Sequence, residues 1–247
     1  MSEELRATTI RISGHQGDDI EAYLAQPEGQ GKRGGVVVIH HMPGYDRATK
    51  EIVRRFAELG YDSMCPNLYS REAPGASPDD AAATVRAAGG VPDDRLLGDV
   101  GGAAAYLRSL ATSNGKAGVI GFCSGGRQSV LAACNLELDA AVDCYGAFVT
   151  GTPPEGFPLR VTNLVDQLPN LSCPLLGLFG ADDQFPSPEQ VKELEQILSA
   201  HGKQFEFHSY EGAGHAFFSP DRPSYNVAAA NDGWQRIAAF FATHLGG

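Results

Sequence analysis

The stretch Gly121-Phe122-Cys123-Ser124-Gly125-Gly126 joins an apolar run, residues 117–122, to a segment with helical character, residues 124–134. Small residues on both sides of Cys123 suit the strained strand-to-helix turn that lifts a nucleophile above a sheet. The backbone N–H of Ser124 would then point at a developing oxyanion, and the helix end favours thiolate over thiol. Taken alone, the stretch is equally well explained by a buried cysteine beside a tight turn. The lysine and spacing of a phosphate-binding P-loop are absent.

Apolar, β-branched runs alternate with helical patterns on both sides of this turn. The patterns predict strands at 36–40, 61–66, 117–122, 140–145, 175–179 and 205–210, and helices at 48–59, 99–111, 124–134, 188–200 and 225–244. Two further strands, 8–13 and 20–26, form an N-terminal β-hairpin. This alternation predicts an α/β fold in which helices cover both faces of a mostly parallel sheet. No linker separates two cores, so residues 1–247 are expected to form a single domain.

Two long segments without regular patterning interrupt the alternation, at 67–91 and 147–173. Long irregular segments inside such a fold often build binding sites or lids.

Length, charge and cysteine usage narrow the function classes. The chain has 247 residues and a formal charge of −11, from 30 acidic and 19 basic side chains. An acidic surface repels phosphate backbones and anionic lipids, which argues against nucleic acid and membranes as partners. The N-terminus lacks a signal-peptide pattern, no apolar run approaches a membrane span, and the five cysteines show no paired spacing. A cytoplasmic protein, monomeric or homodimeric, is expected.

Two downstream motifs supply partners for Cys123. Asp182 and Asp183 directly follow the predicted strand 175–179, and His215 follows the strand 205–210 within Gly212-Ala213-Gly214-His215-Ala216-Phe217. Each motif alone is also explained by a solvated turn or a surface loop. Nucleophile, acid and histidine occur in the order of an α/β-hydrolase, each after its own strand, which favours catalysis.

At this point the sequence resembles the dienelactone hydrolases of the α/β-hydrolase superfamily over nearly its whole length. The resemblance is carried by Cys65-Pro66-Asn67-Leu68-Tyr69-Ser70-Arg71-Glu72-Ala73-Pro74-Gly75, by Gly121–Gly126, by Gly180–Asp183 and by Gly212–Phe217. It implies an α/β-hydrolase fold, a small-molecule ester or lactone as substrate, and no cofactor. It also implies a triad of Cys123, His215 and Asp183, with the acid at the fourth position of a G-x-x-D motif.

The resemblance further implies oxyanion donors and a carboxylate contact. The oxyanion donors correspond to the backbone N–H groups of Ser124 and Met42, since Pro43 has none. The family arginine that contacts a substrate carboxylate corresponds to Arg71. A second family arginine has no direct match: Ser219 occupies its place, and Arg222 lies slightly further on.

His41 stands where the family commonly has a glutamate. It either hydrogen-bonds Cys123 or the substrate, or only shapes the pocket rim. Metal binding by His40 and His41 is disfavoured, because adjacent side chains on an extended chain point in opposite directions and no third ligand is evident.

Aromatic residues gather near the predicted strand ends, and core packing explains most of them. Tyr145 and Phe217 are the best candidates for a pocket wall. The other four cysteines lie in or beside apolar elements and are expected to be small buried side chains: Cys65, Cys134, Cys144 and Cys173.

The mechanism implied is hydrolysis of an ester or lactone through a thioester on Cys123. A broad-scope carboxylesterase, with a phosphoester side activity, is the alternative within enzymes. Outside hydrolysis, Cys123 could be a redox-sensing thiol, or the chain a non-catalytic binding protein of the same fold.

Overall fold

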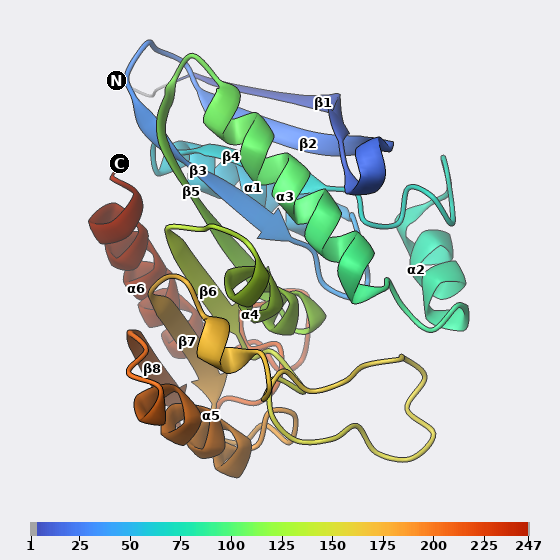
Figure 1. The fold of residues 1–247 in the computed structure, drawn as a ribbon, viewed down its shortest axis with the longest axis vertical. Coiled ribbons are helices and arrows are strands. Elements are labelled where there is room, and N and C mark those ends of the chain that lie inside the picture. Colours follow the sequence, from blue (N-terminus) through green and yellow to red (C-terminus); the bar gives the residue numbers. More distant parts are fainter. Residues whose placement is uncertain (1–3, 247) are drawn as a thin grey trace.

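Eight strands form one sheet in the order β1-β2-β4-β3-β5-β6-β7-β8 (Figure 1). The computed structural model describes residues 4–246. The strands are β1 (Leu5–Ser13), β2 (Asp19–Pro27), β3 (Arg33–Ile39), β4 (Asp62–Pro66), β5 (Ser113–Phe122), β6 (Ala140–Cys144), β7 (Leu175–Gly180) and β8 (Phe205–Tyr210). Strands β1 and β2 pair antiparallel, as do β2 and β4, and the remaining neighbours are parallel. The predicted α/β fold with an N-terminal hairpin is confirmed, and β1 and β8 are its outer strands.

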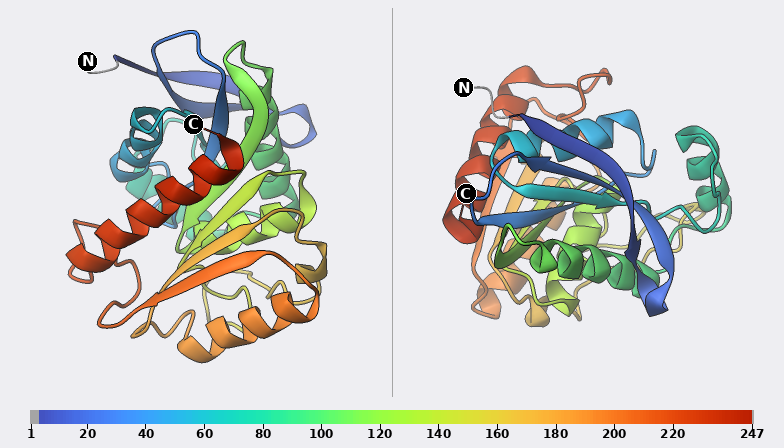
Figure 2. Two further views of the ribbon diagram at one scale, coloured as in Figure 1. Left: turned by 90° about the vertical axis from the view of Figure 1, so that its left-hand side faces the viewer. Right: turned by 90° about the horizontal axis from the view of Figure 1, so that it is seen from above.

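Helices cover both faces of this sheet (Figure 2). They are α1 (Arg47–Glu58), α2 (Pro78–Ala87), α3 (Asp93–Ser109), α4 (Ser124–Asn135), α5 (Pro188–Ala200) and α6 (Val227–Leu245), with short 3-10 turns η1 (His15–Gly17) and η2 (Leu168–Asn170). Helices α1 and α6 pack on one face, and α3, α4 and α5 on the other. Among residues 4–246, no helix is both long and apolar enough to cross a bilayer.

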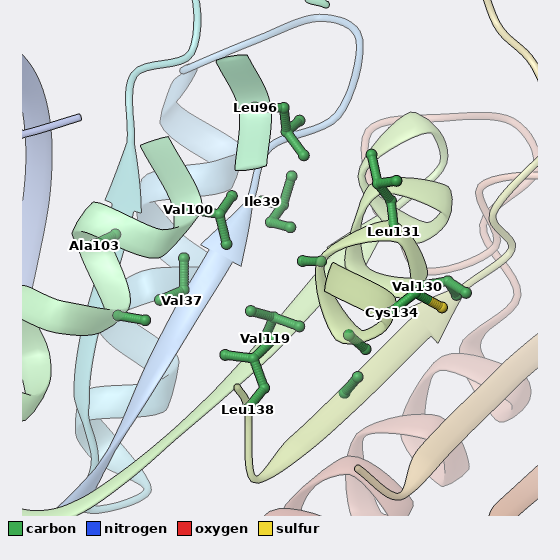
Figure 3. Close-up of a cluster of buried hydrophobic side chains, with 14 of the residues drawn as sticks. Val37, Ile39, Leu96, Val100, Ala103, Val119, Val130, Leu131, Cys134 and Leu138 are labelled. Carbon is green, nitrogen blue, oxygen red and sulfur yellow. The ribbon is translucent and has the colours of Figure 1, made fainter. Parts of the chain in front are cut away.

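Strand β3 shows how the sequence produces two cores from one sheet. Side chains alternate across a strand, so Val36 and Val38 face α1 and α6, whereas Val37 and Ile39 face α3 and α4. All seven residues of β3 are buried, as expected for a parallel strand covered on both sides. Figure 3 shows part of the core on the α3 and α4 side.

The segment 67–91 is less irregular than predicted, because it contains α2. The N-terminal signal is present: the Ser77 side chain accepts a hydrogen bond from the Asp80 N–H, and Pro78 occupies the first turn. The alanine-rich body of α2 gives little apolar periodicity, which explains the omission. Helix α3 likewise begins at Asp93, before the predicted residue 99, with two aspartates in its first turn.

Candidate active site

Cys123 occupies a strained turn between β5 and α4. Its backbone has φ 57° and ψ −120°, a conformation that side-chain-bearing residues rarely adopt. The Cys123 N–H donates to the Cys144 carbonyl at 3.0 Å, which fixes the turn to the end of β6. A Cβ at Gly121 would collide with the Gly125 carbonyl, and a Cβ at Gly125 would lie 2.5 Å from the Ile39 carbonyl. The glycines around Cys123 are therefore required by close backbone packing.

His215 and Asp183 lie together on the loops after β8 and β7. His215 Nδ1 is 2.8 Å from Asp183 Oδ2, and Asp183 is only 7% exposed. The other carboxylate oxygen of Asp183 accepts the Phe185 N–H at 2.9 Å, which fixes the orientation of the acid. Burial disfavours a charged imidazole, but the hydrogen bonds with Asp183 and Cys123 outweigh it and raise the pKa of His215 to about 10.

Cys123, Asp183 and His215 line one open cavity of about 480 Å³. They follow β5, β7 and β8, so the sheet brings together three residues that are distant in sequence (Figure 1). Asp182 lines the same cavity, but it is Asp183 that hydrogen-bonds His215.

Met42 and Ser124 line a second cavity, of about 200 Å³, that also contains Cys123. The carbonyl oxygen of the peptide between His41 and Met42 makes two contacts that hold this peptide in place. The His41 carbonyl accepts the Gly44 N–H at 2.8 Å and lies 3.0 Å from His40 Nδ1. A trans peptide points its N–H opposite to its C=O, so both contacts fix the direction of the Met42 N–H.

Two buried side chains, those of His40 and Tyr69, hold this loop in position. His40 Nε2 accepts the Leu68 N–H at 3.2 Å, which leaves the proton on Nδ1 for the His41 carbonyl. Burial lowers the pKa of His40 to about 4, so the ring is neutral. The Tyr69 hydroxyl donates to the Met42 carbonyl at 3.0 Å, and its ring meets His40 edge-on at 4.6 Å.

A third cavity, of about 270 Å³, lies between α1, α6 and the loop after β8, and Cys123 is not among its lining residues. His41 lines it, and His41 Nε2 is 2.8 Å from Asp46 Oδ2. Burial opposes ionisation of Asp46, but hydrogen bonds from His41 and the Thr49 N–H lower its pKa to about 2.

The two aromatic candidates differ in position. Tyr145 lines the third cavity and packs against the His215 ring, with the centroids 5.2 Å apart. Phe217 is fully buried and lines none of the three cavities, because its ring packs between Tyr145 and Tyr210 in the core. The structure does not place Phe217 on a pocket wall.

Arg71 also lies away from the three cavities. Its two terminal nitrogens each lie 2.8 Å from a carboxylate oxygen of fully buried Asp99, and its Nε lies 2.7 Å from Asp18 Oδ2. Arg71 lines none of the three cavities. Its guanidinium instead ties the turn of the β1–β2 hairpin to α3, so the structure does not bring it to Cys123. Arg222 lines none of these cavities either.

The sequence did not identify Phe157 and Arg160, which line the second cavity with Cys123. Both belong to the irregular segment 147–173, and its irregularity was the only signal in the sequence.

Within residues 4–246 there is no cluster of three metal-ligating His, Cys, Asp or Glu side chains.

An eight-stranded, mostly parallel sheet with a cysteine at the strand-to-helix turn defines an α/β-hydrolase. The dienelactone hydrolase family model matches residues 20–245, so the chain belongs to that family. The expected resemblance and the enzyme class, a hydrolase of esters or lactones, are both confirmed.

Individual relatives support this family assignment. The chain is 36% identical over 241 residues to proteins of Salmonella typhimurium and Escherichia coli named "Putative carboxymethylenebutenolidase", covering 94% of this chain and 85% of theirs. It is 28% identical to a Bradyrhizobium protein named "Probable 2-oxo-3-(5-oxofuran-2-ylidene)propanoate lactonase", over 95% of this chain and 93% of the relative. A crystal structure described as a "Putative Dienelactone Hydrolase" from Klebsiella pneumoniae superposes with a TM-score of 0.85 at 30% identity, over 98% of this chain and 100% of the other.

Proposed function

We propose that this hydrolase cleaves an ester or lactone through a thioester on Cys123, with His215 and Asp183 completing a triad. The observation that carries the proposal is the shared cavity. The thiol of Cys123 and the imidazole of His215 face one space, and His215 is oriented by a buried carboxylate 2.8 Å away. This is the arrangement of nucleophile, base and orienting acid that acyl transfer requires.

In the proposed reaction, the Cys123 thiolate attacks the carbonyl carbon and the carbonyl oxygen becomes an oxyanion. The N–H groups of Ser124 and Met42 stabilise that oxyanion, each contributing about 3–4 kcal/mol in comparable sites. The C–O bond then breaks, the leaving oxygen takes the proton from His215, and a thioester remains. His215 next accepts a proton from water, whose oxygen attacks the thioester and releases the acid and the thiolate.

The substrate class follows from this chemistry. A thiolate expels the oxygen of an enol or aryl ester readily, because such leaving groups need little protonation. The names of the relatives in Salmonella and Bradyrhizobium both describe lactones with an exocyclic double bond. Enol-lactones and activated esters are therefore the proposed substrates.

His41 is proposed to shape the third cavity. Its Nε2 lies 2.8 Å from Asp46, the residue that caps α1, and this contact favours an anchoring role over a contact with Cys123. The cytoplasm is the proposed location, because all five cysteines are free and the nucleophile must stay reduced. The single domain and the monomeric or homodimeric state stay predictions.

The test is stopped-flow hydrolysis of 4-nitrophenyl acetate, with mass spectrometry of protein quenched in acid. Wild type should show a burst of nitrophenol and an acetyl adduct on Cys123. Cys123→Ala should lose both. Cys134→Ala is the matched control, because Cys134 is buried in α4 and lines none of the three cavities. An adduct on another residue, or turnover that survives in Cys123→Ala, would refute the proposal.

A further inference from the structure

Aromatic rings form much of the wall of the third cavity. Phe122, at the end of β5, has its ring centroid 5.6 Å from that of Phe218 and 6.1 Å from that of Trp234. Tyr145 adds a fourth ring, 6.2 Å from Phe122. The cavity volume, about 270 Å³, exceeds the roughly 150 Å³ that is enough to hold benzene in an apolar protein interior. One substituted aromatic ring therefore fits among these side chains.

His41 gives this cavity a hydrogen-bonding group of defined orientation. Its Nε2 lies 2.8 Å from Asp46 Oδ2, and the other carboxylate oxygen of Asp46 accepts the Thr49 N–H at 2.8 Å. A carboxylate only accepts hydrogen bonds, so the imidazole proton lies on Nε2, and Nδ1 of the neutral ring is an acceptor. Within residues 4–246 no group donates a hydrogen bond to His41 Nδ1. The imidazole can therefore accept a hydrogen bond from the hydroxyl of a ligand.

The charges around the cavity disfavour an anionic ligand. Glu51 and Asp221 line the cavity, Asp46 adds a third carboxylate through its contact with the lining imidazole, and Arg54 pairs with Glu51. The guanidinium of Arg55, which also lines the cavity, lies over the tryptophan ring, 3.9 Å from its centroid. Three carboxylates against two guanidinium groups leave a negative balance, which repels a carboxylate but not a neutral molecule.

We propose that the third cavity is a second ligand site, separate from the reacting thiol, and that it binds neutral phenols. The aromatic ring of the ligand packs among Phe122, Phe218 and Trp234, and its hydroxyl donates a hydrogen bond to Nδ1 of His41. Phenols are neutral at pH 7, because a phenolic hydroxyl such as that of tyrosine ionises at about pH 10.

This site lies beside the proposed triad but does not depend on the thioester chemistry. Cys123 is not among the residues that line the third cavity. Tyr145 lines it, and the same ring packs against the imidazole of His215, with the centroids 5.2 Å apart. A phenol in the cavity is therefore one side chain away from His215 and leaves the nucleophile free.

The test uses the fluorescence of Trp234, which is the single tryptophan of the chain and lines this cavity. Protein alkylated on Cys123 with iodoacetamide, which obstructs the two cavities around the thiol, is titrated with phenol and three analogues. Anisole lacks the donor, cyclohexanol lacks the aromatic ring, and benzoate is an anion. Phenol should give a saturable change, with a Kd about five- to tenfold lower than that of anisole, as expected for one hydrogen bond. Cyclohexanol should bind more weakly than phenol, and benzoate should give no saturable change.

Two variants test the hydrogen bond. His41→Ala should remove the preference for phenol over anisole, because only phenol loses an acceptor. Asp46→Ser should reduce that preference, since serine can still cap α1 but cannot orient the imidazole as the carboxylate does. His201→Ala is the matched control, because His201 lies exposed at the end of α5 and lines none of the three cavities.

The absence of a saturable change with phenol would overturn the inference, and so would benzoate binding as tightly as phenol. A preference for phenol over anisole that survives in His41→Ala would overturn it as well. Absence of an acyl adduct on Cys123 in the unmodified protein would instead refute the proposed function, and phenol binding would be unaffected.

Discussion

Tyr69→Phe tests whether the loop after β3 contributes to the proposed acylation of Cys123. The change removes one oxygen and keeps the ring, including its edge contact with His40. It deletes the hydrogen bond to the Met42 carbonyl at 3.0 Å and leaves that carbonyl without its tyrosine partner. Two contacts to the His41 carbonyl remain, so the Met42 N–H should lose alignment without being lost altogether.

The expected effect follows from the value of one buried neutral hydrogen bond, about 1–1.4 kcal/mol. This corresponds to acylation slowed about five- to tenfold. Complete loss of the Met42 donor would cost on the order of 10²–10³-fold, which sets the upper limit. The burst rate with 4-nitrophenyl acetate measures acylation directly.

Alkylation of Cys123 by iodoacetamide provides the internal reference, because that reaction needs the thiolate but no oxyanion donor. Tyr69→Phe should leave the alkylation rate unchanged. Tyr106→Phe is the matched control, since Tyr106 lies in α3 and its hydroxyl makes no hydrogen bond within residues 4–246. An unchanged burst rate, or acylation and alkylation slowed alike, would refute the idea that Tyr69 acts through the Met42 N–H.

Three further outcomes follow from the charged groups. Arg71→Met should lower the free energy of unfolding by about 3 kcal/mol, measured by urea denaturation, because the buried Asp99 carboxylate loses its ion-pair partner. The same change should leave KM for acidic and neutral esters unchanged. A rise in KM for the acidic esters alone would contradict this. Burial raises the pKa of Asp143 from 3.8 to about 7, so the native state holds the proton more tightly and stability should fall as pH rises from about 4 through about 7. Asp143→Asn should make the melting temperature less dependent on pH in this range and should raise it at pH 8. A steeper fall of the melting temperature with pH in the variant would contradict the predicted direction. Asp183→Asn should lower the pKa of His215 from about 10, followed by NMR titration of the imidazole ring protons, and an unmoved titration would show that Asp183 does not stabilise the imidazolium.

Most of the fold could be predicted because its signals are local. Strand β8 and helix α5 have the predicted bounds, and α5 begins with a capping box formed by Ser187 and Gln190. The order of the motifs placed Cys123, Asp183 and His215 after separate strands, and parallel strands end at one edge of a sheet. Helix α2 was missed because its alanines give weak periodicity.

The residues that line the candidate site were harder to predict, because their positions depend on long-range pairing. A sequence motif cannot show that the guanidinium of Arg71 is already occupied by Asp18 and Asp99, which lie 53 and 28 positions away. Nor can it show that Arg160 lines a cavity with Cys123, since the position of Arg160 depends on a contact with Gly89. The burial of Phe217 could not be predicted either, because it depends on the aromatic rings that pack around it.

The two outer strands of the sheet have a consequence for self-association. Strand β1 exposes Arg6 and Arg11, and β8 carries Glu206 beside His208. An open strand edge is a template for pairing with another chain, and charged side chains along it oppose such pairing. Both free edges of this sheet are protected in this way. Copies of the protein are therefore disfavoured from joining into a continuous intermolecular sheet, and contacts between them should use helices or loops.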